Sequence, residues 1–159
     1  KICTLPPKYS KMNFSIYSDD SFMRMAILEA KMAYEQDEVP VGAVIVSKNV
    51  VIAKARNSVQ QLNDPTAHAE LLAISAAAEF LGSKYLNECT LYVTLEPCPM
   101  CAGALFWSQM GRVVFATKDE KRGCGLYAPT IYHPKTEVSE GLFADEASLL
   151  LKAFFKNKR

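Results

Sequence analysis

The sequence has no excess of charge of either sign and no long hydrophobic run. Eighteen Lys and Arg residues oppose seventeen Asp and Glu residues, which leaves a net charge of +1 over 159 residues. This balance excludes a strongly basic nucleic-acid-binding coat, although not a local basic patch. The richest apolar stretch, residues 71–81, contains Ser75 and Glu79 and is far shorter than the roughly 20 residues that a membrane-spanning helix needs. The sequence therefore predicts no transmembrane segment.

The first residues also lack a secretory signal. Residues 1–18 contain no apolar h-region and no periodicity, so we expect a poorly ordered N-terminal tail and a cytoplasmic chain with reduced thiols. An odd number of cysteines without a signal argues against a disulfide framework, so metal binding by some of them is the better hypothesis. The five cysteines are Cys3, Cys89, Cys98, Cys101 and Cys124.

The remainder, residues 19–159, has the composition of one globular domain, with half of all residues apolar and 22% charged. One helix is expected to start at residue 18 or 19 and another at Asp64, with Asp64 as N-cap and Pro65 as the first helical residue. Periodicity then predicts strands and further helices, with mostly loop over residues 118–137. The strands are expected over residues 41–46, 50–55, 90–94 and 112–116, and the helices over residues 99–108 and 144–155. This order of elements predicts a three-layer α/β domain with a mixed sheet.

A candidate metal site begins with two cysteines. Cys98 and Cys101 lie three residues apart where a helix starts, so their sulfur atoms share one face and the helix N-terminus favours the thiolate. Alone, this C-x-x-C motif fits a redox dithiol, half of a structural zinc site or two core cysteines. His68, in a chain whose other histidine is His133, supplies a third ligand of the right softness for zinc. Three protein ligands leave a fourth position for water, as in catalytic zinc sites.

Glu70 lies two residues after His68 and can take a proton from such a water. On its own it fits a solvated acid near a helix N-terminus equally well. The remaining cysteines, Cys3, Cys89 and Cys124, are interpreted as structural or incidental.

Two motifs together carry a resemblance to a known family. His68-Ala69-Glu70 and Pro97-Cys98-Pro99-Met100-Cys101 match the H-x-E and P-C-x-x-C signature of zinc deaminases of nucleobases. From about residue 20 onward the chain resembles the bacterial tRNA-specific adenosine deaminases. The matching stretches are residues 39–44, 64–70, 91–98, 100–104, 111–115 and 141–146.

The resemblance implies a cytidine deaminase-like α/β/α fold with a central mixed five-stranded sheet. It also implies a homodimer, one Zn²⁺ per chain, and conversion of the wobble adenosine in a tRNA anticodon stem-loop to inosine. The implied site residues are the zinc ligands His68, Cys98 and Cys101, the proton shuttle Glu70, the base-contacting Asn57, and Asp119 and Lys121 near the RNA loop. Without the resemblance, Asn57 fits a turn residue after a strand, and Asp119 and Lys121 fit a solvated turn.

Other substrates stay open because residues 122–138 look shorter than and different from the family pattern. Pro99 and Trp107 resemble guanine deaminases of the same superfamily, whereas residues 140–146 resemble the tRNA enzymes. The alternatives are a zinc deaminase of free guanine, cytosine or a nucleoside, and a non-catalytic zinc-binding protein. For an RNA substrate we expect phosphate contacts from the C-terminal basic residues, and for a homodimer an interface on the apolar helix over residues 99–107. These basic residues are Lys152, Lys156, Lys158 and Arg159.

Overall fold

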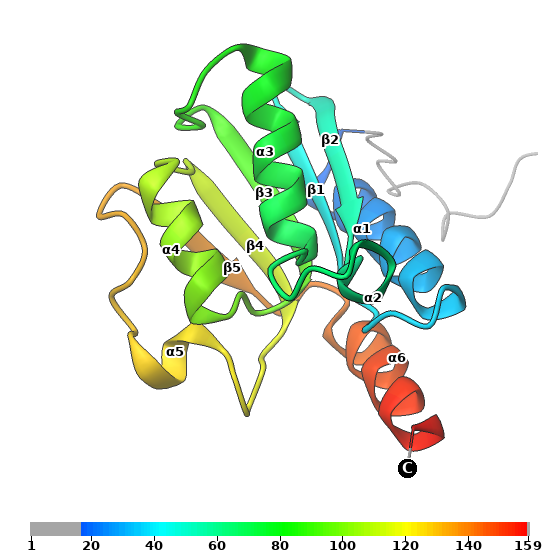
Figure 1. Cartoon of the computed structure of the whole chain (residues 1–159). Helices are drawn as coiled ribbons and strands as arrows, with labels where there is room; N and C mark the ends of the chain where they lie inside the picture. Colours follow the sequence, from blue (N-terminus) through cyan, green and yellow to red (C-terminus); the bar gives the residue numbers. More distant parts are fainter. Residues whose placement is uncertain (1–16, 159) are drawn as a thin grey trace, which may run out of the picture.

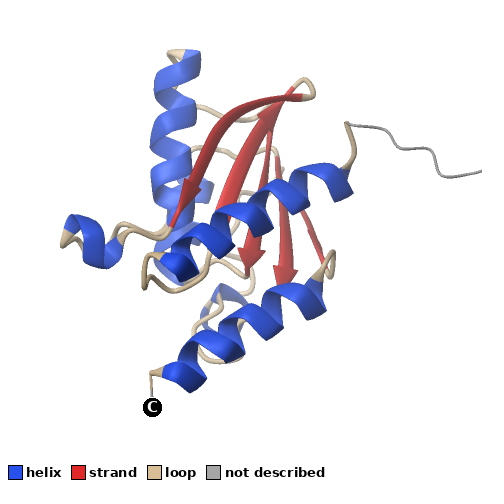
Figure 2. Cartoon of the chain, turned by 90° about the vertical axis from the view of Figure 1, so that its right-hand side faces the viewer, coloured by secondary structure: helices blue, strands red, loops and turns tan. Residues whose placement is uncertain are grey.

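The computed structural model describes residues 17–158 as three layers. A five-stranded sheet forms the middle layer (Figure 1). Helices α1 (Asp19–Glu35) and α6 (Ala144–Asn157) cover one face, and α3 (Ala69–Leu81) and α4 (Pro99–Trp107) cover the other, as the turned view in Figure 2 also shows. The expected α/β/α fold with a mixed five-stranded sheet is confirmed. The expected N-terminal tail lies outside the described residues except for residues 17 and 18.

The sheet is mixed, in the order β2-β1-β3-β4-β5. Its first three strands are antiparallel neighbours, and β3, β4 and β5 are parallel. The first two strands of the chain form a hairpin, in which Ser47 pairs with Val50 around Lys48 and Asn49, which both have positive φ. The strands are β1 (Gly42–Ser47), β2 (Val50–Arg56), β3 (Cys89–Leu95), β4 (Arg112–Thr117) and β5 (Glu137–Glu140).

Side chains alternate between the two faces of the sheet and build two cores. The core beneath α3 and α4 includes Ala43, Ile45, Leu91, Val93, Val113 and Phe115. The core beneath α1 and α6 includes Val44, Val46, Tyr92, Val114 and Ala116. This double burial holds the three central strands in register, and with them the loops that follow β3 and β4.

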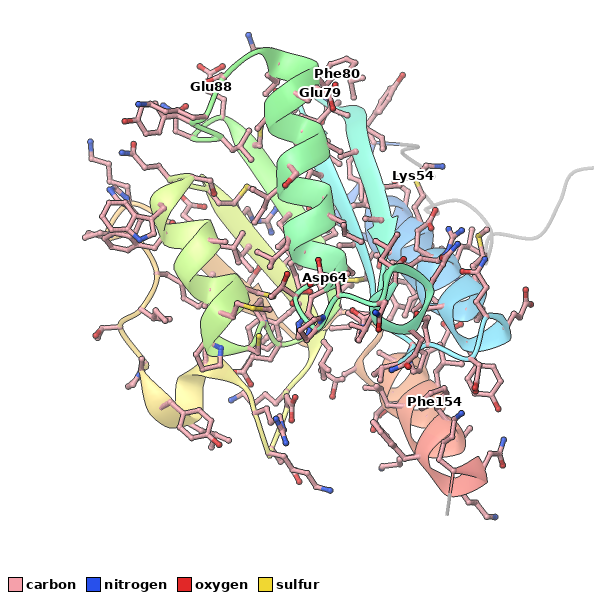
Figure 3. The ribbon with its side chains drawn as sticks, viewed as in Figure 1. Lys54, Asp64, Glu79, Phe80, Glu88 and Phe154 are labelled. Carbon is pink, nitrogen blue, oxygen red and sulfur yellow. The ribbon has the colours of Figure 1, made fainter. Side chains whose placement is uncertain are left out.

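The predicted start of α3 at Asp64 is wrong. The Asp64 carboxylate instead accepts hydrogen bonds from the backbone N–H and the hydroxyl of Thr66 at 2.8 and 2.7 Å, and so closes a local turn. Figure 3 shows Asp64 in the loop before α3. The helix begins at Ala69 with His68 as its N-cap residue, and it ends before its C-cap residue Gly82, whose φ is 60°.

Three short elements were not predicted. The helix α2 (Val59–Leu62) lies between β2 and α3, and α5 (Cys124–Tyr127) lies in the segment expected to be mostly loop. Strand β5, with all four residues exposed, offers no alternation for a sequence pattern to detect. Among residues 17–158, no helix has the length and apolarity needed to cross a membrane.

The chain directions place the starts of α3 and α4 at one edge of the sheet. Strands β2 and β3 are each antiparallel to β1, and β3 is parallel to β4, so the segments that follow β2, β3 and β4 leave from the same edge, next to α5 (Figure 1). Ligands of α/β proteins bind at such carboxyl ends of parallel strands.

Candidate active site

Three of the predicted site residues converge at this edge. His68 and Cys98 are the N-cap residues of α3 and α4, and Cys101 lies in the first turn of α4. His68 Nδ1 lies 3.7 Å from Cys98 Sγ and 3.5 Å from Cys101 Sγ. Within residues 17–158 this is the one group of three or more His, Cys, Asp or Glu side chains placed to share a metal ion. Cys89 and Cys124 are buried outside it, and Cys3 lies outside the described residues.

The spacing fits zinc. A tetrahedral ion with Zn–S bonds of about 2.3 Å and Zn–N bonds of about 2.0–2.1 Å holds sulfur and nitrogen about 3.5–3.6 Å apart. Both sulfur–nitrogen distances are close to this value. The donor set of one imidazole and two thiols is also one that zinc prefers.

Hydrogen bonds within the trio already favour an ionised thiol. The Cys101 thiol and then His68 lower the pKa of Cys98 to about 4. The same pairing raises the pKa of Cys101, and the contact with Cys98 raises the pKa of His68. These shifts favour one thiolate in the trio at neutral pH. A bound metal cation can then displace the remaining protons of the trio.

Glu70 is buried beside this trio. It lies in the first turn of α3 with 4% of its surface exposed, which contradicts the alternative of a solvated acid. Burial raises the pKa of Glu70 to about 7, and the Cys101 thiol is a hydrogen-bond partner of its carboxyl group. A carboxyl group that titrates near neutral pH can both accept and release a proton there.

A cavity of about 570 Å³ opens at His68 and Cys98, a size within the usual range for small-ligand sites. Two exposed cations and an exposed aromatic ring, all from the segment after β4, form its outer rim. The lining residues are His68, Cys98, Pro99, Met100, Lys121, Arg122 and Tyr127. Lys121 was predicted near the site, whereas Arg122 and Tyr127 belong to the segment whose sequence differs from the family pattern.

Asn57 and Asp119, the two predicted substrate contacts, both make local hydrogen bonds. The buried Asn57 accepts a hydrogen bond from the Ala69 backbone N–H through Oδ1 at 3.1 Å. The structure gives its Nδ2 no hydrogen-bond partner within residues 17–158, so this group is free to donate to a base edge. Asp119 Oδ1 accepts from the backbone N–H groups of Lys121 and Arg122 at 2.9 and 3.0 Å. Asp119 therefore shapes the turn that carries both cations.

Glu96 is a buried group at the site that the sequence did not single out. Its carboxylate accepts from the backbone N–H groups of Asp119 at 3.2 Å and Gly125 at 2.9 Å. A lone Glu after a strand carries no signal of such a role. In the structure Gly123 and Gly125 lie opposite it, and a Cβ at either position would crowd this carboxylate.

The C-terminal helix offers fewer free cations than its sequence suggests. Lys158 forms an ion pair with Asp37 at 2.6 Å, whereas Lys152 and Lys156 are exposed. Arg159 lies outside the described residues.

The chain resembles known deaminases over most of its length. Residues 16–117 match the family described as the cytidine and deoxycytidylate deaminase zinc-binding region. The tRNA-specific adenosine deaminase of Aquifex aeolicus is 48% identical over 145 residues, which cover 87% of this chain and 94% of that protein.

Two solved structures are similar as well. One, from work on A-to-I editing by tRNA:A34 deaminases at the wobble position of transfer RNA, has a TM-score of 0.77 and 42% identity. It covers 82% of this chain and 99% of its own. The other, a guanine deaminase from Nitrosomonas europaea, has a TM-score of 0.78 and 25% identity, and covers 95% of this chain and 93% of its own. The chain thus belongs to the cytidine and deoxycytidylate deaminase family and, within it, to the tRNA-specific adenosine deaminases.

Proposed function

We propose that the protein hydrolytically deaminates adenosine to inosine at the wobble position of tRNA. The observation that carries this proposal is a buried carboxyl group, that of Glu70, next to a trio of zinc-type ligands under an open cavity. A purely structural zinc site normally has four protein ligands and no buried acid beside them. We assign one zinc ion per chain to His68, Cys98 and Cys101.

The residues divide the chemistry among them. When bound, the metal supplies a Lewis acid that lowers the pKa of water toward neutrality. Glu70 accepts the proton of the water that adds to C6 of adenine. It delivers that proton to the ring nitrogen N1. It then takes the proton of the new C6 hydroxyl and passes it to the amino group, so that the C6–N bond breaks, the C6 carbonyl of inosine forms and ammonia leaves. Asn57 Nδ2 orients the base, since Oδ1 is held by Ala69.

The substrate has to present its base outside a helical stack, because the reacting atom C6 of a stacked base cannot reach the site. The exposed cations of the rim, Lys121 and Arg122, are placed to contact phosphates of a splayed anticodon loop. Lys152 and Lys156 on α6 are two further exposed cations that we expect to contact phosphates. The loop of a tRNA anticodon stem offers both unpaired bases and accessible phosphates.

We propose further that the protein works as a homodimer through α4. Trp107 at the end of this helix is 78% exposed and packs edge-to-face against Phe106 at 5.4 Å. An exposed Trp on an apolar helix is typical of an interface.

The test is inosine formation in an anticodon stem-loop by wild type, Glu70→Gln and Glu79→Gln. Glu79 is an exposed acid on the same helix and serves as the matched control (Figure 3). Glu70→Gln should retain zinc and lose about 10²–10⁴-fold in turnover, as expected for removal of a general acid–base. Glu79→Gln should behave as wild type. Normal turnover by Glu70→Gln would remove Glu70 from the mechanism.

A free purine is the second candidate substrate, favoured by the structural similarity to a guanine deaminase. Ammonia release from free guanine, with no inosine in the stem-loop, would select that function instead.

A further inference from the structure

We propose that Glu96 is a positioning residue that holds the cationic rim of the cavity in place and thereby sets affinity for the RNA substrate. The proposal rests on the proposed function for its substrate and on the contacts of Glu96 for its geometry.

The rim segment has almost no regular structure of its own. Between the end of β4 at Thr117 and the start of α5 at Cys124, the chain forms no helix or strand, and the Gly123 N–H donates to the Asp119 carbonyl at 3.0 Å in a turn. Lys121 and Arg122 lie within this stretch. A contact that holds the backbone of this stretch in place therefore also sets the positions of the Lys121 and Arg122 side chains.

The Glu96 carboxylate fixes both ends of the stretch. Oε2 accepts the Asp119 N–H at 3.2 Å, and Oε1 accepts the Gly125 N–H at 2.9 Å. Its own backbone N–H donates to the Thr117 carbonyl at 2.8 Å. Because Glu96 follows β3 directly and is only 9% exposed, it ties the rim to the rigid sheet.

The carboxylate of Asp119 links the backbone held by Glu96 to the two cations of the rim. Asp119, held at its N–H by Glu96, accepts from the N–H groups of Lys121 and Arg122. The Tyr127 hydroxyl donates to the Lys121 carbonyl at 2.9 Å. A chain of hydrogen bonds therefore runs from the sheet through Glu96 and Asp119 to the backbone of the two cations.

The glycines opposite Glu96 complete the arrangement. A Cβ on Gly123 would overlap Glu96 Oε2, and a Cβ on Gly125 would lie 2.9 Å from Oε1 with only the Glu96 Cδ also within 4 Å. Gly125 has no positive φ, so its backbone accepts alanine. Only the carboxylate is crowded by that change.

The first test compares Glu96→Gln with Glu38→Gln. Glu38 is a matched control, since it is 2% exposed and accepts two backbone N–H groups, those of Gln60 and Gln61, away from the rim. In Glu96→Gln the side-chain amide faces one of the two N–H donors and loses that hydrogen bond. We expect KM for the stem-loop to rise about 5- to 100-fold, with kcat and zinc content unchanged. Glu38→Gln should keep the wild-type KM.

The second test is a double-mutant cycle. Gly125→Ala should raise KM in the wild type but add little in a Glu96→Ala background, because the crowded oxygen is gone. Additive effects would show that Gly125 acts independently of Glu96 and would overturn the proposal. Gly125→Ala also supplies the measurement should Glu96→Gln fail to fold.

Amide hydrogen exchange separates this inference from the proposed function. The amides of Asp119 and Gly125 should exchange at least about tenfold faster in Glu96→Gln than in Glu38→Gln, whatever the substrate. Exchange as slow as in wild type, or loss of zinc in step with the rise in KM, would overturn the positioning role. If the wild type fails to deaminate the stem-loop while exchange responds as expected, the proposed substrate is wrong and the assignment of Glu96 stands.

Discussion

Replacing Asp19 by Asn should destabilise the protein by about 1–2 kcal/mol at neutral pH. Asp19 opens α1 and receives two hydrogen bonds from Arg112, at 2.9 and 2.6 Å, and one from the Tyr92 hydroxyl at 2.6 Å. Asn preserves the shape and can still accept from Tyr92. The change therefore removes the charge and leaves the packing.

The magnitude follows from exposure. The Asp19 and Arg112 side chains are 42% and 32% exposed, so solvent screens their attraction. This doubly hydrogen-bonded ion pair therefore contributes about 0.5–1 kcal/mol to the free energy of unfolding. Loss of the negative charge at the helix N-terminus adds about 0.3–1 kcal/mol. A matched Asp20→Asn variant loses only this second contribution. At about 2–4 °C per kcal/mol, the thermal midpoint of Asp19→Asn should fall by about 2–8 °C.

The pH dependence gives a sharper test. The hydrogen bonds from Arg112 lower the pKa of Asp19 below its usual value of 3.8. The contribution is therefore complete above that value and is lost as the pH falls through the lower folded-state pKa. Thermal unfolding should show a constant gap between wild type and Asp19→Asn from pH 5 to 8, closing below about pH 4. A gap that changes between pH 5 and 8, or one equal to that of Asp20→Asn, would refute this account.

Three further predictions address the site. Cys101→Ala should lose zinc, measured by atomic emission, whereas Cys89→Ala should retain it; equal contents would contradict the ligand assignment. Lys121→Ala should flatten the slope of log Kd for RNA against log salt by about 0.7, the value for one phosphate contact on a single strand. The control Lys48→Ala, on the β1–β2 hairpin, should leave the slope unchanged. An unchanged slope in Lys121→Ala would show that Lys121 contacts no phosphate. Trp107→Glu should shift sedimentation equilibrium toward the monomer, and an intact dimer would move the interface away from α4.

The family signature singled out the candidate metal ligands His68, Cys98 and Cys101, because its H-x-E and P-C-x-x-C motifs are short stretches of local sequence. Local capping signals failed at Asp64, since a hydrogen-bonded turn with Thr66 competes with the helix and delays it to Ala69. Strand β5 could not be predicted from the sequence pattern, because every side chain on it is exposed and only its pairing with β4 defines it as a strand. The role of Glu96 could not be predicted either, because its hydrogen-bond partners are backbone groups that only the fold brings close to it.

The placement of His68 and Cys98 on two separate helices has a consequence for folding. A metal ion held by these two proposed ligands would join positions 30 residues apart in the chain, and so would act as a reversible cross-link between the starts of α3 and α4. By analogy with a disulfide, closing a loop of this length restricts the unfolded chain by about 3–4 kcal/mol. Metal binding and folding would then be coupled, so that a chelator would lower the free energy of unfolding of the whole domain as well as remove the proposed activity.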